Sequence, residues 1–224
     1  MITLAVLDMA GTTVSDGGVV EAAFVEALAG MGFDREGPEL VPHLEYVRRT
    51  MGQSKIDVFT SVFDGDERRA HEANRRFEEA FDGAVSRGEV DALPGAETAL
   101  GALRAMGVRI CLTTGFSRPT REQIIDVLGW RDLIDLSLSP ETGIRGRPYP
   151  DMILTALMRL DIDDVRAVAV AGDTTSDILS GHRAGASVVA GVLTGAHDRA
   201  RLSEASPTHI LTGIEELPGV LALS

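Results

Sequence analysis

Four nearly continuous apolar runs of strand length constrain the fold of this chain more than any other feature. They span residues 2–7, 108–112, 165–171 and 187–192, and a fifth, weaker run spans residues 209–211. Strands that are buried on both faces show such runs, because polar residues do not alternate with the apolar ones. Helical patterns separate the runs, at residues 96–106, 118–128, 150–160 and 177–184. This alternation predicts an α/β fold with an open, mostly parallel sheet.

Residues 17–91 interrupt the alternation, because they contain no apolar run suited to a buried strand. They carry amphipathic helical patterns rich in Glu, Arg and Ala instead. These patterns cover residues 19–31 and 66–86, and shorter helices are expected between residues 39 and 63. We therefore predict two domains, a helical domain of residues 17–91 and an α/β core of residues 1–16 and 92–224.

Charge and composition exclude several classes of function. The formal net charge is −13, which argues against nucleic acid or an anionic membrane surface as a partner. No run approaches the roughly 18 apolar residues that a membrane-spanning helix needs, and the N-terminus shows no signal-peptide pattern. Cys111 is the only cysteine, so no disulfide can form within the chain. We expect a cytoplasmic protein whose partner is a small molecule.

Polar residues follow the predicted strands at the edge where open α/β sheets bind ligands, the carboxyl ends of the strands. A carboxylate after the first run, a Thr-Gly pair after the second and two carboxylates after the third suit a bound phosphoryl group. The residues concerned are Asp8, Thr114, Gly115, Asp173 and Asp177, with Arg147 just before the helical pattern at 150–160. Each alone is explained as a helix cap, a buried hydroxyl or a surface ion pair, but together they predict one phosphoryl site.

Asp8, Thr114, Arg147 and the pair Asp173 and Asp177 resemble the four sequence motifs of the haloacid dehalogenase (HAD) superfamily. The resemblance covers the whole chain. It implies a Rossmann-like core of the HAD fold, an inserted α-helical cap domain of type C1, and a hydrolase that requires Mg²⁺. It makes Asp8 the nucleophile that forms an aspartyl-phosphate, with catalytic help from Arg147, Thr114 and Asp177. The implied metal ligands are Asp8, Asp173 and the carbonyl of Ala10.

Two departures from the common HAD pattern narrow the resemblance. Ala10 stands where most members have a second aspartate that protonates a departing ester oxygen, and Arg147 stands where most have a lysine. Both departures, and the strings DMAGTT, LTTGFSR, GRPYPDM and GDTTSD, resemble the phosphonatase (phosphonoacetaldehyde hydrolase) family. The string MGQSKID at residues 51–57 resembles the cap segment that holds the Schiff-base lysine of that family, and Lys55 is the only lysine of this chain.

The phosphonatase resemblance implies hydrolysis of the C–P bond of phosphonoacetaldehyde or a related aldehyde phosphonate. A carbanion is a poor leaving group, and an imine between Lys55 and the aldehyde would accept its electrons. A departing carbon needs no acid poised for an ester oxygen, which fits Ala10. The cap would close over the site, and the resemblance also suggests a homodimer. The residues expected to contact substrate are Ala10, Gly11, Thr12, Met51, Gly52, Gly115 and Phe116.

Other features of the sequence keep two alternatives open. Val58 and Phe116 stand where phosphonatases carry a histidine and a tyrosine, and residues 191–211 look more like HAD phosphatases in general. The first alternative is a HAD phosphatase for a small phosphate monoester, although Ala10 would leave the departing alkoxide without its acid. The second is a non-catalytic phospho-acceptor, against which the helical insert and Arg147 argue. The five histidines lack metal-ligand spacing and are interpreted as structural or surface residues.

Overall fold

The computed structural model describes residues 1–15 and 17–223, and a six-stranded sheet forms its centre. The strand order is β5-β4-β1-β6-β7-β8, and each neighbouring pair is parallel. The strands are β1 (Leu4–Asp8), β4 (Arg109–Thr113), β5 (Leu136–Leu138), β6 (Val168–Gly172), β7 (Val188–Val192) and β8 (His209–Leu211). The predicted α/β fold with a mostly parallel sheet is therefore confirmed.

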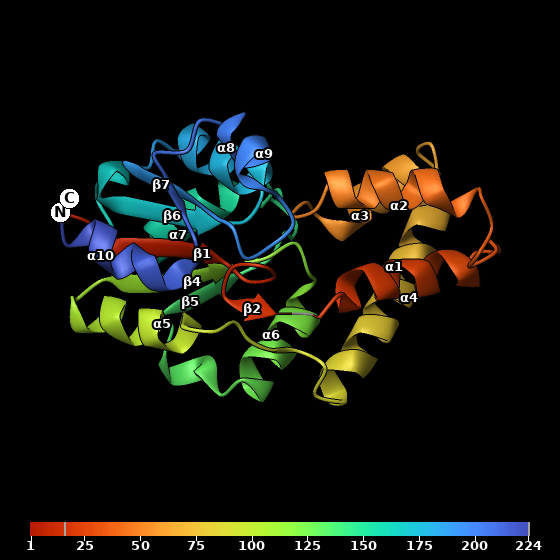
Figure 1. Cartoon of the computed structure of the whole chain (residues 1–224), viewed down its shortest axis with the longest axis horizontal. Helices are drawn as coiled ribbons and strands as arrows, with labels where there is room; N and C mark the ends of the chain where they lie inside the picture. The colour runs from red at the N-terminus through yellow and green to blue at the C-terminus, as the bar shows by residue number, and fades with distance from the viewer. Residues whose placement is uncertain (16, 224) are drawn as a thin grey trace.

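Helices cover both faces of the sheet (Figure 1). They are α5 (Ala96–Ala105), α6 (Arg118–Val127), α7 (Asp151–Arg159), α8 (Thr175–Ala184), α9 (Arg199–Ser203) and α10 (Leu217–Leu221). Every residue of β1 is buried. Ala5 and Leu7 join the core cluster that contains α5, whereas Leu4 and Val6 join the cluster that contains α7. This two-sided burial is the physical reason for the continuous apolar run in the sequence.

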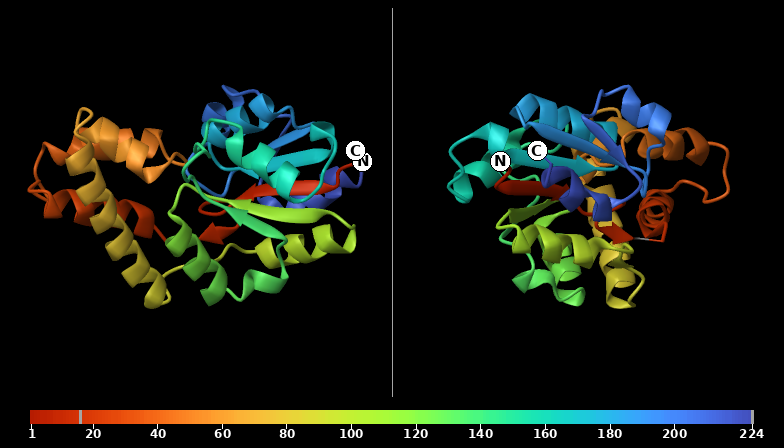
Figure 2. Two further views of the ribbon diagram at one scale, coloured as in Figure 1. Left: turned by 180° about the vertical axis from the view of Figure 1, so that it is seen from behind. Right: turned by 60° about the vertical axis from the view of Figure 1, so that its left-hand side comes forward.

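A small antiparallel pair is formed by β2 (Val14–Ser15) and β3 (Asp91–Ala92). Along the chain, four further helices follow β2 and precede β3 in the described residues. They are α1 (Val19–Gly30), α2 (Leu40–Arg49), α3 (Lys55–Val62) and α4 (Glu67–Ser86). Figures 1 and 2 show them gathered beyond the end of the sheet that is opposite the two termini. The division into a core of residues 1–16 and 92–224 and a cap of 17–91 stays a prediction. Its first boundary falls beside Asp16, which lies outside the described residues.

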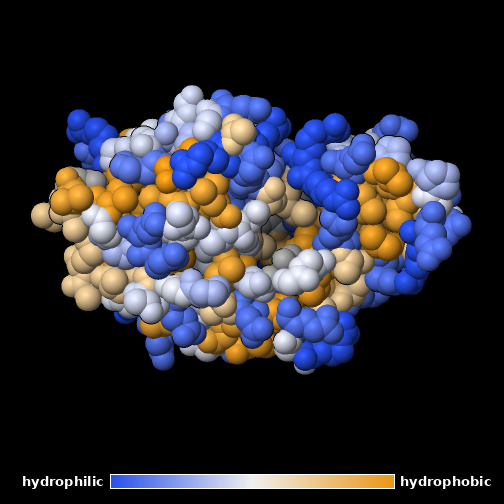
Figure 3. Space-filling model, in the orientation of Figure 1, coloured by the Kyte–Doolittle hydropathy of each residue, from blue (hydrophilic) through white to orange (hydrophobic). Residues whose placement is uncertain are grey.

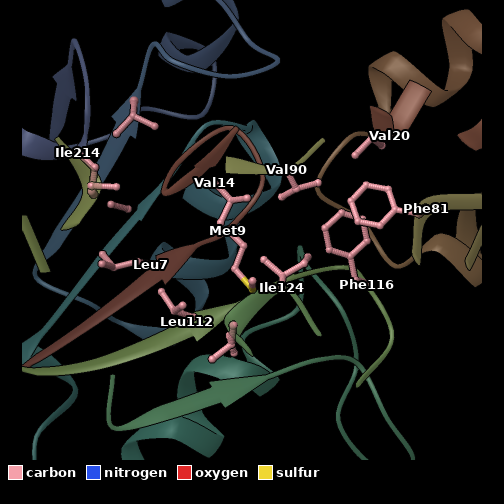
Figure 4. Close-up of a cluster of buried hydrophobic side chains, with 14 of the residues drawn as sticks. Leu7, Met9, Val14, Val20, Phe81, Val90, Leu112, Phe116, Ile124 and Ile214 are labelled. Atoms are coloured by element: carbon pink, nitrogen blue, oxygen red, sulfur yellow. The ribbon is translucent and has the colours of Figure 1, made fainter. Parts of the chain in front are cut away.

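Aromatic rings hold the helices α1, α3 and α4 together and join them to the sheet. The ring of Phe24 on α1 lies 4.9 Å from that of Phe59 on α3 and 4.7 Å from that of Phe77 on α4, measured between centroids. Phe81 on α4 lies 4.5 Å from Phe116, which follows β4 (Figure 4). One hydrophobic cluster therefore runs from the sheet into the helices. Among the described residues, no helix has the length and apolar character needed to span a membrane.

The structure corrects three local predictions. Residues 165–167 form a 3₁₀ turn instead of the start of a strand, because the side chain of Asp164 accepts a hydrogen bond from the backbone N–H of Arg166. The edge strand β5 was not predicted, because its three residues are too short a run to stand out. Helix α8 begins at Thr175 instead of Asp177, since Thr174 caps it.

Candidate active site

A cavity of about 300 Å³ lies between the carboxyl ends of the strands and the helices α1 and α3. The space-filling view shows a hollow where the helical part meets the rest of the molecule (Figure 3). Most of the predicted site residues line this cavity, although the first and the last of them, Asp8 and Asp173, are 165 positions apart in the sequence. They are Asp8, Ala10, Gly11, Met51, Gly52, Lys55, Thr114, Gly115, Phe116, Arg147 and Asp173. The structure brings these residues together, and their chemical roles remain proposals.

The turn after β1 places the Asp8 carboxylate at the floor of the cavity. Asp8 is the last residue of β1 and is 3% exposed. The backbone N–H groups of residues 12–14 donate hydrogen bonds to the carbonyl of Met9. The hydroxyl of Thr13 donates to the carbonyl of Asp8 at 2.9 Å. Gly11 has a φ of 84°, and a Cβ there would lie 2.6 Å from Oδ2 of Asp173. Glycine at this position therefore lets the turn pass beside that carboxylate.

Arg147 connects two of the buried carboxylates. Its Nη1 lies 2.5 Å from Oδ1 of Asp8 and also bonds Oδ1 of Asp177. All three side chains are 4% exposed. Burial raises the pKa of Asp8 to about 6, Arg147 opposes this rise, and the charge of Asp177 adds to it. Burial, and then the charges of Asp8 and Asp177, raise the pKa of Asp173 well above its ordinary value.

This cluster fits a bound Mg²⁺ in its charge and in its donor atoms. When ionised, the carboxylates of Asp8, Asp173 and Asp177 carry three negative charges, against one positive charge on Arg147, and a divalent cation would balance the remainder. Carboxylate and carbonyl oxygens are the hard ligands that Mg²⁺ takes, and the ion usually keeps several waters. Among the described residues, no group of three or more His, Cys, Asp or Glu side chains is placed to hold a metal. The candidate ligands are therefore Asp8, Asp173 and the carbonyl of Ala10, completed by water.

The loop after β6 fixes the two remaining carboxylates in different ways. The side chain of Thr174 and the carboxylate of Asp177 form a capping box at the start of α8, and the backbone N–H of Thr174 donates to Asp177 at 3.1 Å. This bonding turns Asp177 toward Arg147 and away from the cavity. Asp173 accepts a hydrogen bond of 2.7 Å from the backbone N–H of Ala196, on the loop after β7. The side chain of His197, also on that loop, accepts one of 3.1 Å from the backbone N–H of Thr175.

Lys55 is the first residue of α3 and enters the cavity from the helical side. It is 8% exposed. Its Nζ lies 5.2 Å from the ring centroid of Phe116, 5.8 Å from that of Phe24 and 6.0 Å from that of Phe77. The only lysine of the chain is therefore held at a wall of aromatic rings inside the cavity that contains Asp8.

The segment Met51–Ser54, just before α3, packs tightly against three loops of the sheet. A Cβ on Gly52 would lie 2.6 Å from Oγ1 of Thr174, and a Cβ on Gly115 would lie 2.3 Å from the carbonyl oxygen of Gln53. A Cβ on Gly146 would lie 3.1 Å from Cβ of Ser54. Glycines at these contacts allow the segment to approach the loops of the sheet closely. Lys55 directly follows the segment and lines the cavity.

Two predicted residues lie outside the cavity. Thr12 was expected to contact substrate, but its side chain is fully buried, because its backbone N–H bonds the carbonyl of Met9 within the turn. Its hydroxyl has no hydrogen-bond partner in the part of the chain that the structure describes. Asp177 does not line the cavity either, and it reaches the site only through Arg147.

The structure also adds residues that the sequence did not single out. The loop after β7 contributes Thr194, Gly195 and Ala196 to the lining. The rule that ligands bind at the carboxyl ends of strands would have pointed to this loop, because it follows the fourth apolar run. Glu21 on α1 also lines the cavity and is paired with Arg48 at 2.5 Å. No sequence signal distinguishes Glu21 from the other acidic residues of the helical part.

Comparison with known proteins agrees with this geometry. The family model of the haloacid dehalogenase-like hydrolases matches residues 2–185, and the chain belongs to this family. A phosphonoacetaldehyde hydrolase from Bacteroides fragilis is 28% identical, with 97% of this chain and 95% of that protein covered. The probable phosphatase IndB from Dickeya dadantii is 25% identical, with 98% and 93% covered. A hydrolase from Pseudomonas syringae has a similar fold, with a TM-score of 0.84, 21% identity and coverage of 100% and 99%.

Proposed function

We propose that this HAD-family hydrolase is phosphonatase-like and uses Mg²⁺ to cleave the C–P bond of phosphonoacetaldehyde or a related aldehyde phosphonate. One observation carries the proposal: Asp8 and the only lysine of the chain, Lys55, line the same cavity from opposite sides. Ala10, also in that cavity, offers no acid for a departing ester oxygen. A nucleophile for phosphorus and an amine for an aldehyde suit a substrate that carries both groups.

The phosphoryl half of the reaction would take place at the strand ends. An oxygen of Asp8 forms a bond to phosphorus while the P–C bond breaks, and water later hydrolyses the aspartyl-phosphate to phosphate and Asp8. Arg147, 2.5 Å from Asp8, neutralises charge as the carboxylate meets an anionic group. Mg²⁺ held by Asp8, Asp173 and the Ala10 carbonyl would supply further positive charge to the phosphoryl oxygens.

The carbon half of the reaction would take place at Lys55. Its neutral amine adds to the aldehyde carbon, and loss of water leaves an iminium. When the P–C bond breaks, its electron pair forms a C=C bond, and the C=N pair returns to nitrogen, which gives an enamine. A proton to carbon and a water molecule then release the aldehyde and restore the amine. The wall of aromatic rings around Nζ limits the access of water while this takes place.

Two similarities support the proposal, and one residue favours an alternative. The Bacteroides fragilis relative supports it by its name, and the string at residues 51–57 supports it by its lysine. Val58, one helical turn after Lys55, is 2% exposed and offers no group for proton transfer. A phosphatase for a small phosphate monoester is therefore the second candidate, and the Dickeya dadantii relative is named a probable phosphatase.

Substitution of Lys55 by arginine discriminates between the two candidates. Arginine keeps the positive charge but does not lose its proton, so it cannot form the imine. We expect Mg²⁺-dependent phosphate release from phosphonoacetaldehyde by the wild type and none above background by Lys55→Arg. Para-nitrophenyl phosphate serves as the ester control in both proteins. Release from the ester alone would establish the phosphatase, and equal release from the phosphonate by both proteins would exclude the imine at Lys55. A stable phosphoprotein without turnover would instead indicate a phospho-acceptor.

A further inference from the structure

A second, smaller cavity of about 120 Å³ adjoins the active-site cavity at Lys55. Lys55, Gly115 and Phe116 line both cavities, so these residues form the wall between them. Helix α4 contributes Asn74 and Glu78 to the lining of the smaller one. Glu78 and Lys55 therefore line the same small cavity, which Asp8 does not line.

The position of Glu78 follows from the helical period of α4. Asn74, Phe77, Glu78 and Phe81 have the spacing i, i+3, i+4, i+7, which places them on one face of the helix. The ring centroid of Phe77 lies 6.0 Å from Nζ of Lys55, which shows that this face is turned toward the amine. Glu78 is half-buried on the same face.

The smaller cavity has polar side chains in its lining and a volume that can accept water. The side-chain amide of Asn74 donates a hydrogen bond of 2.9 Å to Oε1 of Glu78. Its other polar atom, Oδ1, is buried and has no partner in the part of the chain that the structure describes. A volume of about 120 Å³ has room for several water molecules.

The chemistry proposed at Lys55 needs a group that moves protons. Addition of the amine to the aldehyde forms the N–C bond and moves the C=O π pair to oxygen, so a proton must leave nitrogen and another must reach oxygen. The C–O bond then breaks with a second proton on oxygen, and the nitrogen pair forms C=N. In sum, amine, aldehyde and one proton give iminium and water. A carboxylate within reach of both atoms through water serves this exchange.

We propose that Glu78, through water bound beside Asn74, carries the protons of imine formation at Lys55. This inference rests on the proposed function, because it assigns a residue to the imine step. Among the described residues of the helices α1–α4, Glu21 is a further acidic residue that lines a cavity with Lys55, and it is less suited. Glu21 lines the active-site cavity, but Arg48 holds both of its carboxylate oxygens, at 2.8 and 2.5 Å, and the hydrogen bond lowers its pKa.

Reductive trapping measures the imine step apart from C–P cleavage. Acetaldehyde and borohydride are added to the full-length protein, and ethylation of the Lys55 peptide is followed by mass spectrometry over time. Because the chain has a single lysine, the modified side chain is identified without ambiguity. We expect Glu78→Gln to slow the trapping by about 100-fold, the lower end of the range for general acid–base catalysis. Glu78→Asp, which keeps the acid, should recover part of the rate.

Glu79→Gln is the matched control, because Glu79 is the neighbouring residue of α4, is exposed and pairs with Arg75. We expect it to trap at the wild-type rate. A variant Glu78→Ala tested with added formate separates proton transfer from packing. Formate should restore trapping if the carboxyl group carries protons, and chloride at equal ionic strength should not.

The outcomes separate this inference from the proposed function. Trapping on Lys55 in the wild type with equal rates in Glu78→Gln and Glu79→Gln would overturn the role of Glu78 and leave the imine in place. Slow trapping in Glu78→Ala that formate does not restore would show that the residue acts through packing, which also overturns the inference. No trapping on Lys55 in the wild type would remove the proposed function, and the role of Glu78 with it.

Discussion

Substitution of Gly115 by alanine tests whether the segment Met51–Ser54 must close against the strand ends for activity. A Cβ at this position would lie 2.3 Å from the carbonyl oxygen of Gln53, and ordinary van der Waals contact begins at 3.4 Å. The segment, or the loop after β4, therefore has to move by about 1 Å. Because the clashing atom belongs to the backbone, rotation of a side chain cannot relieve the contact. Overpacking of this kind costs about 1–3 kcal/mol in the free energy of unfolding.

The effect on catalysis should exceed the effect on stability. Lys55 directly follows the displaced segment, and a 1 Å misplacement of a reacting group costs about 100-fold in rate. We expect kcat/KM for Mg²⁺-dependent phosphate release to fall about 100-fold in Gly115→Ala. The matched control is Gly101→Ala, in the middle of α5, where a Cβ would meet nothing within 4 Å. The control should keep its activity and gain about 0.5–1 kcal/mol in urea unfolding. Unchanged kcat/KM in Gly115→Ala would refute a closed working state with these contacts.

Three further predictions concern charge and burial. Mg²⁺ should raise the melting temperature of the wild type by relieving repulsion among the buried carboxylates, and Asp173→Asn should lose most of this rise in a thermal-shift titration. Burial raises the pKa of Asp57, which means that the folded protein favours the protonated carboxyl group. The stability that this group contributes is therefore present at low pH and is lost as the pH rises through the raised pKa. Urea unfolding between pH 3 and pH 7 should therefore show Asp57→Asn gaining stability relative to the wild type as the pH increases. The Cys111 thiol, whose pKa is raised by burial, should react with a disulfide reagent only after unfolding.

The sequence predicted those parts of the fold that depend on local patterns. The strands β1, β4, β6 and β7 were found because each is buried on both faces and so leaves a continuous apolar run. The edge strand β5 has three residues and only one buried side chain, and so left no such signal. Residues 165–167 are partly exposed and were assigned to a strand because they are apolar or adjoin apolar residues. Asp164, which turns this segment, acts through a side-chain hydrogen bond that an apolar pattern does not contain.

The site residues also divide into those that a local sequence pattern predicts and those whose position depends on tertiary packing. Asp8, Thr114 and Asp173 could be predicted because each lies at the end of a strand or directly after it, and strands in one parallel sheet end at one edge. The contact of Lys55 with this edge depends on how the helices α1–α4 pack, and only the resemblance to a known family suggested it from the sequence. The position of Thr12 depends on the backbone bonds of a single turn. Glu78 belongs to a long helix rich in charged residues, and nothing in its pattern sets it apart until the cavity beside Lys55 is seen.

The leaving group of the proposed reaction connects several unusual features of the site. An ester oxygen departs with a proton from a nearby acid, and the turn after Asp8 offers only Ala10 at that position. A carbon departs with its electrons accepted elsewhere, and the only lysine of the chain lies on the opposite wall of the same cavity. An amine that forms an imine needs proton transfer, which the buried Val58 cannot provide and a carboxylate across a water-sized space can. If the proposed reaction is correct, the missing acid at the strand ends and the carboxylate in the cavity beside Lys55 are two consequences of one change, from a leaving oxygen to a leaving carbon.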